Sequence, residues 1–273
     1  MPFADLLLLL VIGIGAGVLG GLLGIGGSII MIPALTILFD LNMHLAQAAA
    51  LIVTFFVAVP ATLQHHRARA VRWPMVVRLL PFGIIFIIVG VFASNLFSGE
   101  NEEMLRRVFA VFLLYVVGQN TIKLFDRTRD ESEGVERLNW WRMGVVGSSV
   151  GFMAGLLGVG GGIVTVPLLQ RICHVRLRQA IAASSAIMCL TAIFGAISKN
   201  ATLYVHEEDI APRFLDIRSD QIVLESMLIA ACLASTAFLG GMIGASLTHK
   251  LPLFWVRLAF IILLTVTSVE MLF

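Results

Sequence analysis

The chain has 273 residues, of which 59% are hydrophobic and only 13% are charged, and its formal net charge is +2. The charged fraction is about half of that in a typical soluble domain, which excludes a soluble globular protein. The small net charge indicates no nucleic-acid partner, and the spacing of the three cysteines fits neither a zinc site nor a disulfide framework. Several apolar stretches reach the roughly 20 residues that cross a bilayer as a helix. The sequence therefore predicts an all-α integral membrane protein.

The first half begins with an apolar stretch over residues 4–24. Three of its glycines are spaced four apart, at Gly13, Gly17 and Gly21. Small residues at this spacing let helix backbones approach closely in a membrane, so we expect these three to serve packing.

A denser glycine cluster follows at Gly24, Gly26 and Gly27, directly before Ser28. Each glycine costs a helix about 1 kcal/mol relative to alanine, so the cluster predicts a break in the helix. β-Branched residues then lead to Pro33, and proline favours the first turn of a helix. We therefore expect a helix to restart near or just before Pro33.

Four further apolar stretches complete the first half, at residues 28–39, 45–63, 79–97 and 104–125. A basic turn separates the second from the third, with Arg67, Arg69 and Arg72. The next segment, residues 126–139, has eight charged residues among fourteen. It is too polar to lie in a bilayer, so we interpret it as a charged linker between two halves.

The second half, residues 140–273, repeats the first membrane segment, residues 1–125. Its apolar stretches cover residues 143–158, 162–172, 179–198, 222–248 and 252–272. The glycines and the proline of the first half recur 134 residues later, at Gly147, Gly151, Gly155, Gly158, Gly160, Gly161 and Pro167. Gly162 extends the second cluster, and Gln179 repeats Gln47. Each half is thus expected to hold one broken segment and three spanning helices.

The distribution of basic residues distinguishes two topologies. If each broken segment re-enters and returns to its own side, the repeats are inverted, and 14 of the 19 Lys and Arg residues share the side of the turn at Arg67. If each broken segment crosses once, the repeats are parallel and the split is 12 to 7. The positive-inside rule favours inverted repeats, with the linker in the cytoplasm and both termini outside.

Broken backbone inside a bilayer is tolerated where protein covers it or where it lines a wet cavity. Two restarting helices near the midplane would direct the positive ends of their dipoles at one place and form an anion site. No Asp, Glu, Lys, Arg or His lies in the middle of any predicted span, and all six histidines fall in loops or at their edges. The interior therefore suits a dipole-built anion site and leaves little for catalysis, so we predict neither an enzyme nor a cofactor.

The candidate substrate-binding residues are the glycines of the two breaks and polar side chains near them. They are Gly24, Gly26, Gly27, Ser28, Gln47, Gly158, Gly160, Gly161, Gly162, Gln179, Ser184 and Ser185. Thr54 and Thr191 are further polar candidates, and Pro33 and Pro167 mark the structural breaks. Each polar side chain could equally form hydrogen bonds between helices.

The paired motifs GLLGIGG…P at residues 21–33 and GLLGVGG…P at residues 155–167 resemble the TauE/SafE sulfite exporter family. The LxQA segments at 45–48 and 177–180 and the basic turn HHRARAVRW at 65–73 are also similar. The resemblance implies a transporter that exports small anions, typically sulfite or organosulfur compounds, across a bacterial inner membrane. Family members often carry a Thr-Ser pair after the break, whereas this chain has Ser184-Ser185 in one half only.

Three functions compete at this stage: an anion exporter, an importer or channel on the same scaffold, and a membrane assembly factor or enzyme. An enzyme would need a His, Asp, Glu or Cys cluster at one membrane depth, and the sequence shows none. The expected partners are a small anionic substrate and the lipid bilayer, and a homo-oligomer is left open. The expected location is the cell inner membrane.

Overall fold

The structure is a computed structural model that describes residues 3–125, 138–205, 222–247 and 253–272. In these ranges the chain forms ten α-helices and one 3-10 turn, which confirms the predicted all-α class. The helices are α1 (Phe3–Leu23), α2 (Ser28–Leu38), α3 (Met43–Arg67), α4 (Trp73–Asn95), α5 (Glu102–Phe125), α6 (Trp140–Leu157), α7 (Gly162–Cys173), α8 (Leu177–Val205), α9 (Ile222–Leu247) and α10 (Leu253–Leu272). The 3-10 turn η1 covers Gly99–Asn101. Residues 126–137 of the linker lie outside the described residues, and so do residues 206–221.

Within the described ranges, six helices are long and apolar enough to cross a membrane: most of α1, most of α8, the first part of α5, and the whole of α3, α4 and α9. α3 and α8 are the most buried of the six. Helix ends carry local signals that explain their positions. The side chain of Asn42 accepts a hydrogen bond from His44 N at 2.8 Å and caps α3, and left-handed Gly158 ends α6.

The glycines spaced four apart bring helices of the two halves into close contact. A Cβ atom on Gly13 of α1 would lie 2.7 Å from the carbonyl oxygen of Leu233 in α9. A Cβ atom on Gly147 of α6 would lie 2.8 Å from the carbonyl oxygen of Leu79 in α4. Such short distances leave no room for a side chain, so these glycines pack backbones as expected. The halves therefore interlock, since α1 packs on α9 and α6 packs on α4.

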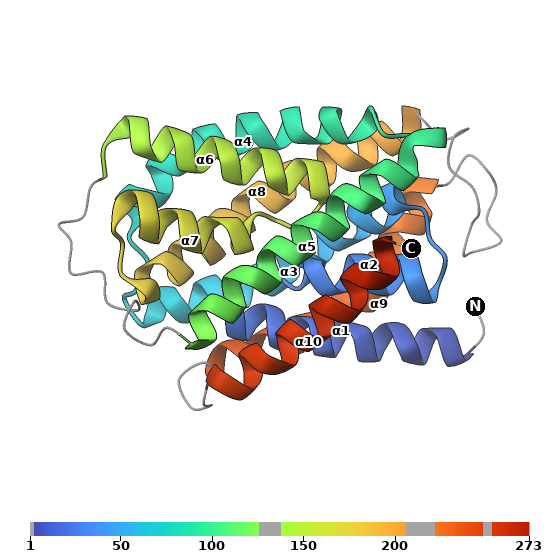
Figure 1. Cartoon of the computed structure of the whole chain (residues 1–273), viewed down its shortest axis with the longest axis horizontal. Coiled ribbons are helices and arrows are strands. Elements are labelled where there is room, and N and C mark those ends of the chain that lie inside the picture. The colour runs from blue at the N-terminus through green and yellow to red at the C-terminus, as the bar shows by residue number, and fades with distance from the viewer. Residues whose placement is uncertain (1–2, 126–137, 206–221, 248–252, 273) are drawn as a thin grey trace.

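Figure 1 shows how each glycine-rich helix is followed by a short helix that turns back. The chain runs inward along α1 and returns along α2 towards the end from which α1 started, and α6 and α7 do the same from the opposite end. The hydrogen bond from Arg142 of α6 to the carbonyl oxygen of Ile172 in α7 joins the outer ends of the second pair. The N- and C-terminal helix ends lie at the same end of the bundle (Figure 1).

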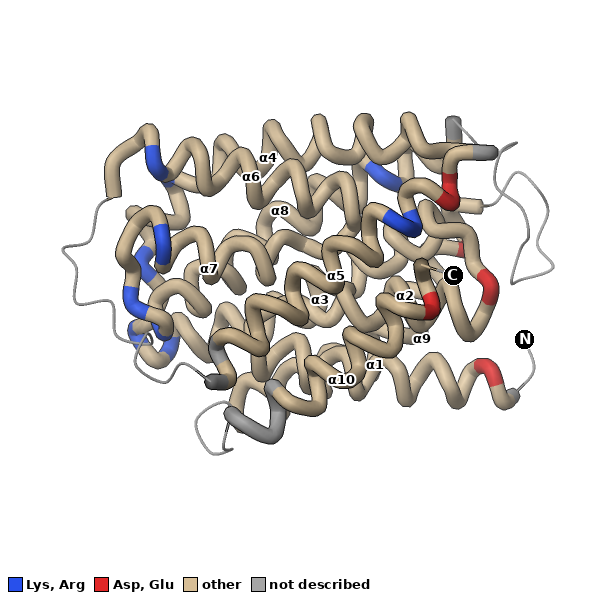
Figure 2. Tube along the Cα trace, viewed as in Figure 1, with Lys and Arg blue, Asp and Glu red and all other residues tan. Residues whose placement is uncertain are grey.

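Charges are separated along the long axis of the bundle (Figure 2). Most described Lys and Arg residues gather where α3 meets α4, where α6 begins and where α7 meets α8; we call this the arginine end. The described Asp and Glu residues lie towards the opposite end, where α1, α5 and α9 begin, α2 meets α3 and α10 ends; we call this the acidic end.

The predicted place of helix restart is wrong for both short helices. α2 begins at Ser28 and α7 at Gly162, so Pro33 and Pro167 lie inside the helices rather than near their starts. The reason is that Gly27 and Gly161 adopt left-handed φ angles of 79° and 76° and reverse the chain at once. α8 also extends beyond its predicted end at residue 198, to Val205.

Candidate functional site

Both glycine clusters are breaks between helices, and their backbone conformations require glycine. Six of the predicted glycines have positive φ angles: Gly24 68°, Gly26 85°, Gly27 79°, Gly158 71°, Gly160 66° and Gly161 76°. A residue with a Cβ atom pays roughly 1–2 kcal/mol to adopt this left-handed conformation. The two breaks, residues 24–27 and 158–161, therefore have closely similar conformations.

The two breaks meet inside the bundle. A Cβ atom on Gly162, which directly follows the second break, would lie 2.8 Å from the carbonyl oxygen of Gly24 in the first. The buried hydroxyl of Ser184, on α8, lies 3.2 Å from the carbonyl oxygen of Gly24 and 3.1 Å from that of Gly162. One hydroxyl thus lies between the first break and the residue that follows the second break.

A residue of α3 lies against both breaks. A Cβ atom on Gly26 would lie 2.9 Å from Thr54 Cγ2, and one on Gly160 would lie 2.6 Å from the same methyl group. Thr54 is fully buried, and its hydroxyl donates to the carbonyl oxygen of Ala50 within α3 at 2.8 Å. The predicted polar candidate therefore faces the breaks through its methyl group, and its hydroxyl serves the helix.

The starts of α2 and α7 directly follow the two breaks. No side chain caps either start, and Ile30 N and Val164 N donate to the carbonyl oxygens of Gly27 and Gly161. The N–H groups of the first two residues of each helix have no acceptor one turn back, and they carry the positive end of the dipole. The hydroxyl of Ser28, the first residue of α2, is buried and has no hydrogen-bond partner among the described residues. An unpartnered buried donor beside a helix start is the arrangement that an anion would complete.

The other predicted polar residues lie in different places. Gln47 packs on the second break, since a Cβ atom on Gly158 would lie 2.8 Å from Gln47 Cβ, and its amide donates to the carbonyl oxygen of Leu156 at 3.2 Å. Gln179 lies in the first turn of α8, with a buried Oε1 that has no partner in the described part of the chain. Ile181 lies against Gly24 in the same way as Gln47 lies against Gly158, since a Cβ atom on Gly24 would lie 2.9 Å from Ile181 Cγ2.

Two predicted hydroxyls serve their own helix. Ser185 donates to the carbonyl oxygen of Ile181 at 3.2 Å, and Thr191 donates to that of Ile187 at 2.9 Å, both within α8. Neither side chain is among the groups that contact the breaks.

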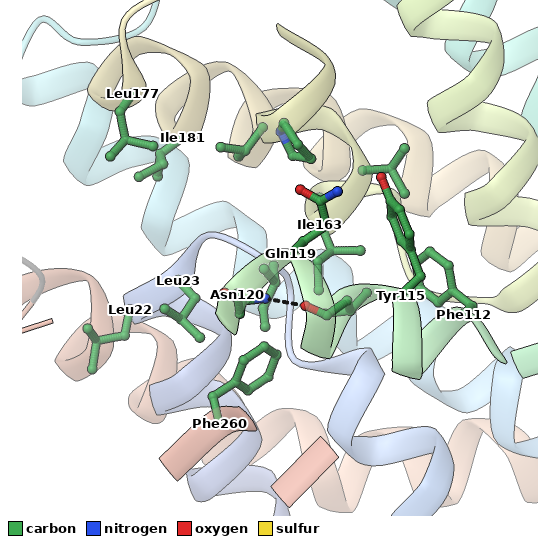
Figure 3. A pocket seen from close by; sticks show the side chains of 16 residues that line it. Leu22, Leu23, Phe112, Tyr115, Gln119, Asn120, Ile163, Leu177, Ile181 and Phe260 are labelled. Carbon is green, nitrogen blue, oxygen red and sulfur yellow. Dashed lines mark hydrogen bonds between the residues drawn. The ribbon is translucent and has the colours of Figure 1, made fainter. Parts of the chain in front are cut away.

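A cavity of about 100 Å³ leads to the breaks from the side of α5. Ile25 of the first break and Gly162 at the start of α7 line it, together with side chains of α1, α5, α8 and α10. Figure 3 shows Tyr115, Gln119 and Asn120 of α5 around it, opposite Leu23 and Ile181. Arg171, at the arginine end, donates to Gln119 Oε1 at 3.2 Å, so the cavity lies on that side of the breaks.

Ionisable side chains are nevertheless buried near helix ends in the described part of the chain, at Lys199, His44, His65 and Glu225. Lys199, placed just past a predicted span, is fully buried in the last turns of α8. Its Nζ lies 2.7 Å from Nδ1 of His44, which is also buried, and 2.9 Å from Ser94 Oγ. Among the described residues, no group of three or more His, Cys, Asp or Glu residues could hold a metal ion.

Sequence comparison adds independent information. A family model described as "Sulfite exporter TauE/SafE" matches residues 9–271. A probable membrane transporter protein of Haemophilus influenzae is 26% identical, with 98% of each chain covered. The probable membrane transporter protein YunE of Bacillus subtilis is 25% identical over 89% of each chain. MamO of Paramagnetospirillum magneticum, also named a probable membrane transporter protein, is 25% identical over 91% of this chain, which spans 41% of that relative's length. No solved structure shows a significant match.

Proposed function

The chain belongs to the TauE/SafE sulfite exporter family of membrane transporters, and from this premise we propose that it carries a small anion across the cell inner membrane. The proposed substrates are sulfite or organosulfur anions, and the proposed direction is export. The meeting of the two breaks at Ser184 is the single observation that carries the proposal. It supports one central site in which two helix starts face the same ligand, which needs no basic side chain.

The proposed binding groups are backbone amides at the starts of α2 and α7, supplemented by the hydroxyl of Ser28. The left-handed glycines hold these starts in place, and Thr54 packs against both breaks. A cavity of about 100 Å³ beside the breaks leaves room for a small ion. Gln47 and Gln179 are proposed as second-line polar groups at the edges of this site.

The proposed architecture is a pair of inverted repeats, residues 1–125 and 140–273, joined by the linker 126–139. Two observations support it: α1 with α2 and α6 with α7 turn back from opposite ends, and three helices follow each pair (Figure 1). Positive residues favour the cytoplasmic side of a membrane, so the arginine end is proposed to face the cytoplasm. The cavity on that side would then receive the anion from inside the cell.

Counterflow in proteoliposomes tests this function against its alternatives. The purified protein is reconstituted with sulfite inside, and efflux is measured with and without sulfite outside. A carrier accelerates exchange when sulfite is present on the far side, whereas a channel on the same scaffold shows no such acceleration. Empty liposomes serve as the control. A protein that moves neither sulfite nor an organosulfur anion above this control contradicts the proposal and favours an assembly role.

A further inference from the structure

A basic cluster lies on the other side of the breaks, away from the cavity. The side chain of Lys199 is 0% exposed, so it is closed to both ends of the bundle. Among the described residues, its hydrogen-bond partners are His44 and Ser94. His44 belongs to the first turn of α3, and Ser94 to the last turn of α4, so the cluster lies towards the acidic end. Three helices thus converge on one ammonium group.

The partners of Lys199 do not neutralise it. An ammonium group has three donors, and the described partners offer two acceptors, Nδ1 of His44 and Oγ of Ser94. No carboxylate of the described residues forms an ion pair with Lys199. Glu102 of α5 instead accepts a hydrogen bond from Met43 N at 2.6 Å. Burial without a counter-charge disfavours the charged form of an amine, so an anion that binds beside Lys199 would stabilise its ammonium form.

A chain of hydrogen bonds links this cluster to the breaks. Ser94, which accepts from Lys199, donates to Gln47 Oε1 at 3.1 Å. Gln47 in turn packs on Gly158, and its amide donates to the carbonyl oxygen of Leu156, next to the second break. The polar groups are therefore continuous from the broken backbone to the buried ammonium, through a bundle that is otherwise lined mostly by apolar side chains.

We propose that Lys199, together with His44 and Ser94, forms a second anion-binding site that receives the transported anion after it leaves the breaks. The inference rests on the proposed function, because the ligand is the same small anion. In this site the anion supplies the counter-charge that the described residues do not offer. The cluster is closed to both ends here, which fits an occluded step between two access states.

Two substitutions of the lysine test the site in proteoliposomes. Lys199→Met keeps the length of the side chain and removes the charge, and Lys199→Arg keeps the charge. We expect Lys199→Met to lower maximal sulfite efflux about tenfold or more, while Lys199→Arg retains a larger share of it. Sulfite binding at equilibrium should change much less in Lys199→Met, since the breaks are intact. A structural role alone would not produce this separation of turnover from binding.

Two controls make the outcome decisive. Asn200→Ala, one residue on, removes the bond to Ser226 and should leave efflux within about twofold of the unmodified protein, because it lies outside the cluster. Ser94→Ala tests the same site without altering the lysine, and should also lower efflux. Normal efflux in folded Lys199→Met overturns the second site and leaves the proposed function standing. Absence of efflux from the unmodified protein overturns the proposed function itself.

Discussion

Ser184 and Gly24 lie 160 positions apart in the sequence, and the hydroxyl of Ser184 donates to the carbonyl oxygen of Gly24 at 3.2 Å. The same hydroxyl lies 3.1 Å from the carbonyl oxygen of Gly162. Ser184 therefore ties the residue that opens the first break to the residue that follows the second. Any rearrangement that moves the two breaks apart has to break one of these two contacts of Ser184.

Ser184→Ala should destabilise the protein by about 1 kcal/mol, because it removes the one hydroxyl proton that the buried carbonyl oxygens of Gly24 and Gly162 share. Anion efflux should fall as well, since the breaks lose their shared anchor. Ser185→Ala is the matched control: the neighbouring hydroxyl bonds only within α8. Thermal unfolding and efflux, measured on both variants, check the prediction. Equal effects of the two substitutions would contradict the anchoring role of Ser184.

Gly13→Ala and Gly147→Ala should lower stability before they affect transport. Each added methyl group meets a backbone oxygen of a neighbouring helix, at 2.7 Å from Leu233 O and 2.8 Å from Leu79 O, and backbone cannot move aside cheaply. Gly15→Ala, also in α1, has nothing within 4 Å of the added atom and should be neutral or slightly stabilising. The melting temperatures of the purified variants in detergent provide the measurement. A neutral Gly13→Ala would show that the stripe is not a close-packing surface.

Replacing Arg67, Arg69 and Arg72 together by Gln should slow efflux most at low ionic strength. The three exposed side chains lie on one turn at the arginine end and would raise the local anion concentration there. Screening shortens from about 30 Å at 0.01 M salt to about 3 Å at 1 M, so the difference from the unmodified protein should shrink as salt rises. Initial rates over a salt series test this. A loss of rate that is the same at all salt concentrations would indicate direct binding or misfolding instead.

The linker 126–139 should be accessible only from the cytoplasm, and the exposed turn at Asn101 only from outside. The separation of charges along the bundle, together with the positive-inside rule, gives this orientation. Ser132→Cys and Asn101→Cys, each introduced after replacement of the three native cysteines, can be labelled with a membrane-impermeant thiol reagent on intact cells. Labelling at residue 132 from outside would reverse the orientation and the proposed direction of entry.

The sequence predicts helix positions well because long apolar runs bounded by polar turns have few alternatives in a membrane. The predicted stretches 104–125 and 162–172, for example, match α5 and α7 within two residues. The glycine clusters also identify both breaks, because several glycines in five residues serve no packing purpose in a helix. Proline is a poorer guide to the restart, since the left-handed glycines had already reversed the chain at Gly27 and Gly161.

The cluster at Lys199 could not be recognised from the local sequence. Ser198, Lys199 and Asn200 read as the polar end of a span, and only the packing of α3 and α4 against this part of α8 buries the lysine. The burial of His44 could not be recognised either, because a histidine beside a helix cap is usually exposed. The one available signal was the apolar residues that continue to Val205, which extend α8 well beyond 20 residues.

The broken-helix site itself is tested by alanine at Gly26 and Gly160. The added methyl groups would lie 2.9 Å and 2.6 Å from Thr54 Cγ2, at left-handed φ angles that alanine adopts only at a cost of roughly 1–2 kcal/mol. Combining each with Thr54→Ser removes the clashing methyl group and keeps the hydroxyl. At Gly160, where the nearest atoms all belong to Thr54, any remaining loss belongs to the altered backbone, whereas at Gly26 the contact with Met188 Sδ at 3.1 Å remains. Gly118→Ala, in open space on α5, is the control for expression and reconstitution.

Sulfite efflux from proteoliposomes that contain Gly160→Ala/Thr54→Ser is the most direct measurement of the central claim. Thr54→Ser and Gly118→Ala are measured beside it, and thermal unfolding verifies that every variant is folded. We predict that the double variant loses most of its efflux while both controls retain theirs. Normal efflux from a folded double variant would contradict an anion site built from the backbone of the two breaks.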